Sequence, residues 1–120
     1  MSELLGIARF RLHDGCLAEF ERLSARCVDI VRTRDPGTLQ YDLYFDDDRR
    51  ECVVIGRYRD SDALIQHRAN IGSELLEALL ATGTVDGELL GVPSRELLAG
   101  LQGTGSEGGD VRWFSPYLSL

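Results

Sequence analysis

The chain has 120 residues, of which 43% are hydrophobic and 28% charged, so it is long and apolar enough to form one globular domain. Its formal net charge is −7, and its 13 basic residues are arginines scattered along the chain. Binding to a phosphate backbone needs clustered basic side chains. The charge pattern therefore excludes nucleic acid as an expected partner.

The three cysteines, Cys16, Cys27 and Cys52, show no CxxC spacing. Disulfide frameworks and metal sites need paired spacings, so we expect free thiols that are buried as small hydrophobic side chains, and no metal site. The N-terminus lacks the basic and apolar segments of a signal peptide, and no apolar run approaches the ~20 residues that span a bilayer. These features predict a soluble, cytoplasmic protein with no membrane partner.

The first part of the chain predicts a strand, a helix and a second strand. Residues alternate between two faces from Leu4 to Leu12, as in a half-buried strand. A helix is expected from Cys16 to Arg34, capped by Asp14, because its apolar residues recur every three or four positions. Asp35-Pro36-Gly37 ends this helix, and the second strand runs from Thr38 to Phe45. One face of that strand would carry Leu39, Tyr41, Leu43 and Phe45.

An acidic turn at Asp46 to Arg50 leads to a third strand, Cys52 to Tyr58. A second long helix is expected from Asp62 to Leu80, with Asp60 or Ser61 as its cap. The rest of the chain predicts a short extra strand (Val85–Val92), a short helix (Pro93–Leu101), a flexible loop (Gly103–Gly109) and a last strand (Val111–Tyr117).

This β-α-β-β-α-β order, with a short extra strand and helix before the last strand, predicts an α+β ferredoxin-like sandwich in a single domain, residues 1–120. We expect a core at 4–80 and 111–118, and an insertion with a flexible loop at 83–109. Both long helices would cover one face of the sheet. The exposed face favours a homodimer that packs sheet against sheet. That face would carry Ile7, Tyr44, Val53, Ile55 and Phe114 among Arg9, Arg11, Asp42 and Arg57.

His67 is the main candidate for chemistry. It lies three residues after Leu64 and four before Ile71, so helical geometry places it on the buried stripe. A neutral imidazole in an apolar cleft can act as a general base or bind a phenolate, and aromatic walls suit a flat substrate. The alternative is a core histidine hydrogen-bonded to a backbone carbonyl or a tyrosine. The aromatic residues expected around it are Phe10, Tyr41, Phe45, Tyr58 and Trp113.

Two other groups of residues are weaker candidates. His13 beside Asp14 could form a base with its orienting group, but exposed residues at a strand-to-helix corner explain the pair more simply. Arg9, Arg57 and Arg112 could hold an anion on the exposed face, although packing in a dimer is the simpler explanation. The sequence contains no GxGxxG, GxxxxGK[ST], HExxH or GxSxG motif.

Two stretches carry a family resemblance. Pro36-Gly37-Thr38-Leu39-Gln40-Tyr41-Asp42-Leu43-Tyr44 resembles the PGxxxYxLY signature of the antibiotic biosynthesis monooxygenase (ABM) family. Asp60 to His67 resembles that family's helix opening, DxxALxxH. The resemblance covers about Leu4 to Leu80, and Val111 to Tyr117 fits the family's last strand. It implies a dimeric α/β barrel with a pocket between the sheet and the helices of each subunit.

Characterised members of the family oxidise aromatic polyketides or quinols with O₂ and use no metal or flavin, because an electron-rich phenolate can reduce O₂ directly. The resemblance therefore implies a cofactor-independent monooxygenase of a small hydroxylated aromatic substrate. His67 would be the base or the phenolate-binding group, and Arg57 an anion stabiliser. The substrate-binding residues would be Phe10, Tyr41, Phe45, Arg57, Tyr58 and Trp113.

The chain also departs from the family pattern. Many members carry a glutamate near the end of the third strand, where Gly56-Arg57-Tyr58 stands here, so a role of that glutamate does not transfer. The first strand has no asparagine, which disfavours the heme-degrading branch. A non-catalytic small-ligand-binding or structural homodimer is the alternative, and a cavity too small for a bicyclic ring would favour it. Isomerase or lyase chemistry is a third interpretation, because fold does not fix function.

Overall fold

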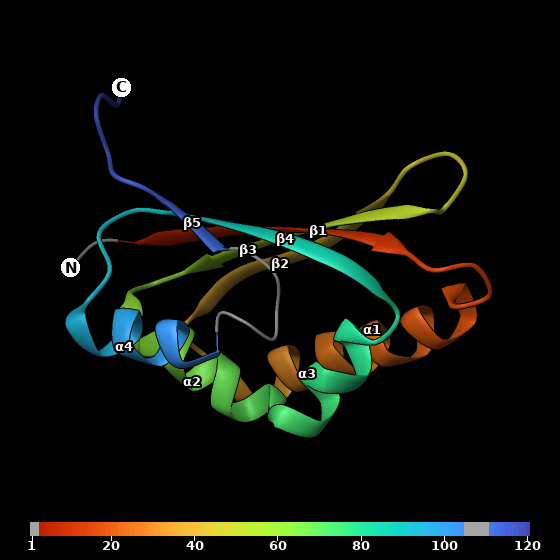
Figure 1. Cartoon of the computed structure of the whole chain (residues 1–120). Coiled ribbons are helices and arrows are strands. Elements are labelled where there is room, and N and C mark those ends of the chain that lie inside the picture. The colour runs from red at the N-terminus through yellow and green to blue at the C-terminus, as the bar shows by residue number, and fades with distance from the viewer. Residues whose placement is uncertain (1–2, 105–110) are drawn as a thin grey trace.

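The computed structural model describes residues 3–104 and 111–120, and these form a two-layer α+β sandwich (Figure 1). In the described residues a five-stranded sheet lies over four helices, which confirms the predicted ferredoxin-like fold. The elements are β1 (Leu4–Leu12), α1 (Leu17–Arg34), β2 (Thr38–Phe45), β3 (Glu51–Tyr58), α2 (Ser61–Ile71), α3 (Ser73–Leu80), β4 (Gly83–Leu90), α4 (Arg95–Thr104) and β5 (Val111–Phe114). Most of the loop expected at 103–109 lies outside the described residues.

The strand order is β2-β3-β1-β4-β5. β1 is antiparallel to both β3 and β4, whereas β5 is parallel to β4. The expectation that the final strand completes the ferredoxin-like sheet is wrong, because Gly83–Leu90 pairs along β1 and Val111–Phe114 forms a short edge strand. The alternation of polar and apolar residues in β4 is weak, since glycines occupy two positions on its helix-facing side. For this reason the sequence predicted only a short extra strand in place of a full-length one.

The second long helix is broken. In place of one helix from Asp62 to Leu80, α2 ends at Ile71 and α3 begins at Ser73. Gly72 between them has φ +81°, a left-handed conformation that glycine adopts without a Cβ penalty, and its N–H still bonds to the carbonyl of Arg68 at 3.0 Å. Asp60 caps α2 as expected, since its side chain accepts a hydrogen bond from the Ala63 N–H at 2.9 Å.

The predicted cap of α1 is wrong. The N-cap position falls on Cys16, which makes no side-chain capping bond, because a turn through Gly15 (φ +84°) separates Asp14 from the helix. Leu39 was also misplaced: it is 43% exposed, since the pairing of β2 with β3 shifts register between Thr38 and Gln40. The last strand ends at Phe114, so Tyr117 lies beyond the sheet and is 90% exposed.

The core lies between the sheet and the helices in two clusters. The larger one joins α1 and α3 to the sheet through Phe10, Phe20, Leu23, Cys27, Cys52, Leu75 and Leu79. The second joins α2 and α4 to the sheet through Leu4, Tyr58, Ala63, Leu64, Leu89 and Leu97. Cys27 and Cys52 are free and buried, as expected for small hydrophobic side chains.

The opposite face of the sheet carries no helix within the described residues (Figure 1). Tyr44 is 57% exposed there, and Phe114 is also exposed. Ile7, Val53 and Ile55 are half-buried. Among residues 3–104 and 111–120, no helix is both long and apolar enough to cross a membrane.

Candidate functional site

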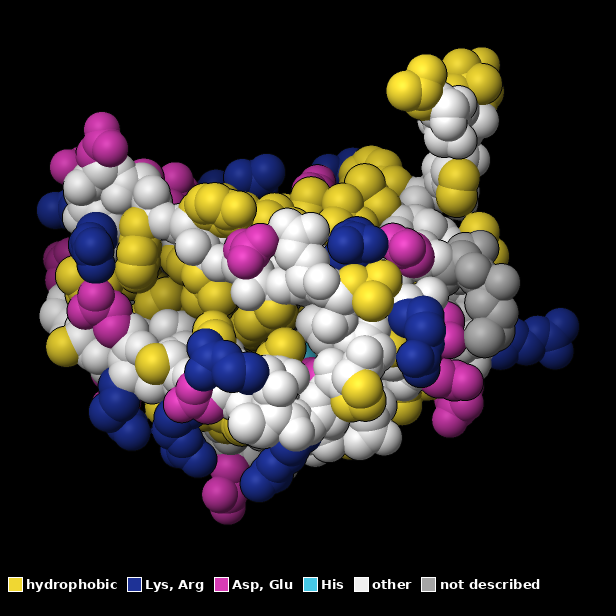
Figure 2. Space-filling view, turned by 180° about the vertical axis from the view of Figure 1, so that it is seen from behind, with side chains coloured by type: hydrophobic (Ala, Val, Ile, Leu, Met, Phe, Trp, Pro, Cys, Tyr) yellow, Lys and Arg dark blue, Asp and Glu magenta, His cyan; other side chains and the backbone are white. Residues whose placement is uncertain are grey.

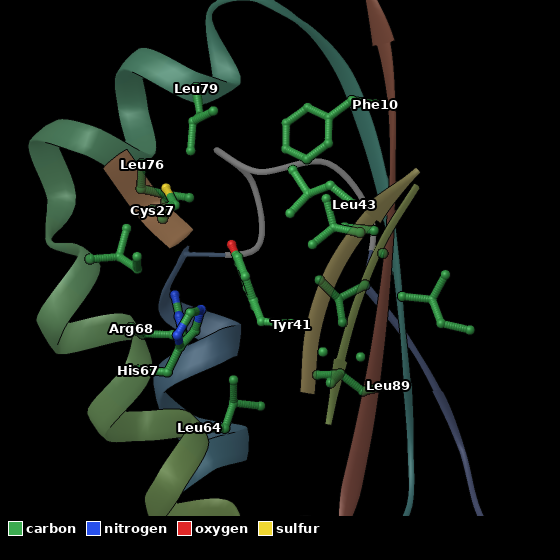
Figure 3. Close-up of a pocket in the computed structure, with 18 of the residues that line it drawn as sticks. Phe10, Cys27, Tyr41, Leu43, Leu64, His67, Arg68, Leu76, Leu79 and Leu89 are labelled. Carbon is green, nitrogen blue, oxygen red and sulfur yellow. The ribbon is translucent and has the colours of Figure 1, made fainter. Parts of the chain in front are cut away.

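A cavity of about 240 Å³ lies between the sheet and the helices, in the space between the two core clusters. Its lining is mostly apolar, and in the described residues it comes from all four helices and all five strands. Figure 2 shows hydrophobic side chains gathered in a hollow between the two layers, and Figure 3 shows the side chains that line the pocket. An apolar cavity with a few polar groups is the usual form of a small-ligand site.

Small residues of the sheet form the floor of this cavity. Gly6 and Gly56 are directly paired across β1 and β3, and Ala8 pairs with Gly87 across β1 and β4. All four line the cavity. The ring of Tyr58 lies over Gly56, where a Cβ would come within 2.5 Å of the tyrosine oxygen. Because Gly56 has no side chain, the Tyr58 ring can pack directly against the sheet, and Ala8 and Gly87 add little bulk to the floor of the cavity.

His67 projects from α2 into the space between the helices and the sheet (Figure 3). It is only 8% exposed, and its Nδ1 lies 2.6 Å from Oδ2 of Asp35, which is 6% exposed. A carboxylate can only accept a hydrogen bond, so Nδ1 is the donor and Nε2 is the ring nitrogen left as an acceptor. The expected partner was a carbonyl or a tyrosine, and the structure supplies a carboxylate instead.

Asp35 is itself held by several donors. The Asn70 side chain donates to its Oδ1 and also to the backbone carbonyl of Arg34, at 3.0 Å. The Thr38 hydroxyl lies 3.4 Å from Oδ2. These bonds join the end of α1, the start of β2 and the last turn of α2, so the carboxylate has a fixed position beside the imidazole.

Sequence reasoning assigned Asp35 only to the turn that ends the helix and so missed its contact with His67. One signal was present: an acidic residue at a helix C-terminus faces the negative end of the helix dipole, which is unfavourable unless another group compensates. Asp35 occupies that C-cap position of α1. The two residues lie 32 positions apart in sequence, so only the tertiary fold identifies the partner.

Tyr41 and Tyr58 flank the imidazole. Each ring centroid lies 5.3 Å from that of His67, in a tilted arrangement. Burial, with a smaller contribution from the charge of Asp35, raises the pKa of both phenols well above the ordinary value of 10. Both tyrosines therefore stay neutral at physiological pH and can donate hydrogen bonds to an oxygen of a bound molecule.

The electrostatics around His67 favour its neutral form. Burial lowers its pKa below the ordinary 6.5, opposed by the hydrogen bond and the charge of Asp35 and reinforced by the positive charge of Arg68. Arg68 also lines the cavity, and burial lowers its own pKa below the ordinary arginine value. The charged and titratable groups that act on this imidazole are thus Asp35, Tyr41, Tyr58 and Arg68. The site combines a neutral base with a nearby cation.

The residues expected at the site are only partly brought together. Phe10, Tyr41, Tyr58 and His67 line the cavity. Phe45 and Trp113 are not among the lining residues: Phe45 packs against Phe20 with a centroid distance of 5.9 Å, and Trp113 packs against the second core cluster. Arg57 lies on the opposite face of the sheet, where its guanidinium contacts Glu3 at 2.9 Å. It therefore does not reach this cavity within the chain.

The weaker candidates form no comparable site. His13 and Asp14 are both exposed at the corner after β1. Arg9 and Arg112 line a second hollow together with two acidic residues, Asp86 and Glu88. Within the part of the chain that the structure describes, no three His, Cys, Asp or Glu side chains gather as a metal site would require. Burial raises the pKa of the Cys27 thiol to about 11, so this pocket residue is not a thiolate.

Comparison with protein family models identifies the family to which this chain belongs. A family model described as "Antibiotic biosynthesis monooxygenase" matches residues 5–78, more than half of the chain. The chain belongs to the antibiotic biosynthesis monooxygenase family. The matched range runs from β1 to α3 and includes His67, Asp35 and both tyrosines, so most of the cavity lies within the family's common part. A search of curated proteins finds no match.

Several solved structures resemble the chain. SnoaB, a cofactor-independent oxygenase from Streptomyces nogalater, is 27% identical with a TM-score of 0.61, covering 79% of this chain and 95% of its own. Rv0793 from Mycobacterium tuberculosis is 26% identical with a TM-score of 0.62, covering 78% and 96%. MupZ from Pseudomonas fluorescens is 20% identical with a TM-score of 0.77, covering 100% and 94%. The likeness to MupZ thus extends the shared fold through β4, α4 and β5.

Proposed function

We propose that this protein is a cofactor-independent monooxygenase that uses O₂ to oxidise a small hydroxylated aromatic compound. The observation that carries the proposal is the apolar cavity in which His67, held by Asp35, lies between two tyrosines in an ABM-family chain. The likeness to SnoaB, described as a cofactor-independent oxygenase, supports the same reaction class.

In the proposed reaction His67 takes the proton of a substrate hydroxyl through Nε2. The resulting phenolate passes an electron to O₂, and the two radicals combine at a ring carbon. Loss of water then leaves a carbonyl, so that one oxygen atom enters the product and the other leaves as water. All four electrons that O₂ accepts come from the substrate, and no external reductant is required. The positive charge of Arg68 and the neutral phenols of Tyr41 and Tyr58 would stabilise the anion.

The cavity volume limits the substrate class. An apolar cavity of about 150 Å³ accepts benzene, and pockets for drug-sized ligands measure roughly 300–1,000 Å³. The volume of about 240 Å³ falls between these values. We therefore expect a compound of one or two rings with at least one hydroxyl group, and larger polycyclic compounds would require the pocket to open.

Oxygen consumption with a panel of one- and two-ring phenols and quinols tests the proposal, and three-ring anthrones in the same panel test the size limit. We expect turnover with one oxygen atom from ¹⁸O₂ in the product, and a loss of roughly 10²–10⁴-fold in His67→Ala, the range typical of a lost general base. His13→Ala is the matched control, because His13 is the other histidine of the chain and is exposed. Full turnover in His67→Ala would show that the assigned role is wrong.

The same panel distinguishes the alternative of a non-catalytic ligand-binding protein. In that case calorimetry would detect binding of a ring compound while the oxygen electrode recorded no uptake above the protein-free rate. The structure leaves space for a ligand in either case, so product formation is the deciding measurement.

We also propose that the protein is a homodimer that buries the open face of the sheet. Within residues 3–104 and 111–120, no helix covers the apolar side chains on that face, among them Tyr44 and Phe114. Sedimentation equilibrium at micromolar concentration should give twice the chain mass of 13.3 kDa. A species of 13.3 kDa would contradict the dimer without affecting the assignment of the cavity.

A further inference from the structure

We propose that Asp35 is a positioning residue of this site, which holds His67 in the tautomer protonated on Nδ1 and so presents Nε2 to the cavity as the base. The catalytic consequence rests on the function proposed above. The tautomer itself is a property of the free protein, so it can be measured whether or not a substrate is known.

The geometry fixes the direction of the hydrogen bond. Both side chains are buried, and the short contact of 2.6 Å joins an acceptor-only carboxylate to Nδ1 of the imidazole. Nδ1 must therefore carry the proton. Because His67 also lines the cavity, the opposite nitrogen, Nε2, is the atom that can accept a proton from a bound hydroxyl.

Asp35 is suited to this role because it cannot easily turn away. Asn70 donates to its second oxygen, and Thr38 approaches the same oxygen that accepts from His67. The residue itself closes α1, with its N–H bonded to the carbonyl of Val31 at 3.2 Å and its carbonyl accepting from the Thr38 N–H at 3.1 Å. Backbone and side chain are thus both anchored, as a group that orients a base requires.

A purely structural explanation is that the pair only joins the end of α1 to α2. The two explanations differ in what Asp35→Asn would do. An asparagine of the same shape can donate its amide N–H to Nδ1, which keeps the connection but places the imidazole proton on Nε2. If the pair is only structural, the change of tautomer should leave kcat unaltered. If Asp35 positions the base, the variant with its imidazole proton on Nε2 should be inactive.

The experiment is ¹⁵N NMR of the histidine ring, combined with kinetics, on the wild type and Asp35→Asn. We expect the wild type at pH 8 to carry the His67 proton on Nδ1 and the variant to carry it on Nε2. With a substrate found in the oxygen-uptake panel, kcat should fall roughly 10²–10⁴-fold while KM changes little. Asp29→Asn is the matched control: it removes the same charge from the same helix, in an exposed ion pair with Arg32 at 3.0 Å, and should leave both readouts unchanged.

Asn70→Ala provides a second variant if Asp35→Asn does not fold by circular dichroism. It removes one hydrogen-bond donor to Asp35 and leaves the carboxylate in place, so we expect a smaller fall in kcat and a mixture of tautomers. A wild-type proton on Nε2, or equal kcat in wild type and a folded Asp35→Asn, would overturn the proposal. If no compound is turned over but the tautomer switches as expected, the oxygenase function fails and the assignment of the Nδ1 tautomer to Asp35 stands.

Discussion

A methyl group added at Gly56 should destabilise the protein through Tyr58. A Cβ at this position would lie 2.5 Å from the tyrosine oxygen, 2.9 Å from Cζ and 3.0 Å from Cε2. Three atoms of one rigid ring are involved, and the ring is buried against the second core cluster. The clash therefore cannot be relieved by moving the end of a flexible chain, and the whole ring must shift.

Overpacking of this kind costs about 1–3 kcal/mol. For a domain of 120 residues, 1 kcal/mol lowers the Tm by roughly 3–6 °C, between the values for smaller and larger domains. Glycine-to-alanine changes inside a strand otherwise gain about 0.5–1 kcal/mol through backbone entropy. The net effect we expect for Gly56→Ala is thus a loss of about 0.5–2 kcal/mol, together with weaker binding of ring compounds, because Tyr58 is pushed into the cavity.

Gly6→Ala is the matched control, since Gly6 is the direct cross-strand partner of Gly56. Its added Cβ would find Leu89 at 3.4 Å and Tyr58 at 3.6 Å, which are ordinary contacts. We expect this variant to be neutral or slightly stabilised. Urea unfolding of both variants, read by circular dichroism, makes the comparison. Equal stability of the two variants would refute the conclusion that the Tyr58 ring packs directly against Gly56.

Two further predictions concern stability. The pKa of His67 is lower in the folded protein than in the unfolded chain. The unfolded chain therefore binds more protons than the folded protein as the pH falls below about 6.5. As a result, the free energy of unfolding should fall by up to about 1.4 kcal/mol per pH unit. Urea titrations between pH 8 and 5.5 should show this slope in the wild type and a smaller slope in His67→Gln; equal slopes would contradict it. Gly72→Ala should lose about 1–2 kcal/mol because its φ is +81° although no atom obstructs a Cβ, whereas Gly100→Ala in the middle of α4 should be neutral or stabilising. Equilibrium unfolding that gives the two glycine variants the same sign of change would show that backbone strain at Gly72 is unimportant.

Local sequence patterns were sufficient to predict features that depend on a single helix or strand. Alternation located β1 and β2 with their observed bounds, because a two-residue period is visible within a single strand. Helical spacing placed His67 on the buried side of α2 for the same reason. The alternation of β3 also put Arg57 on the face opposite Tyr58, so its separation from the cavity could have been read from the sequence.

What could not be predicted depends on distant segments. The apolar spacing continues from α2 into α3, and nothing in it reveals that Gly72 takes a left-handed conformation. The sequence predicted only a short extra strand at Val85–Val92, and the place of β4 (Gly83–Leu90) beside β1 was missed because its own pattern mixes glycine with charged residues. The contact of Asp35 with His67 needs the end of α1 and the middle of α2 to meet, which is a property of the packed helices.

The position of Asp35 links the fold to the proposed chemistry. The Asp35-Pro36-Gly37 turn ends α1 and begins the strand that carries Tyr41. Gly37 allows α2 to approach the turn closely, since a Cβ there would lie 2.6 Å from that of Ala63. The backbone packing that sets this approach therefore also sets the distance between Asp35 and His67. A base whose orientation follows from this close backbone packing is preorganised before any ligand arrives, and this is the condition under which a positioned proton acceptor accelerates a reaction.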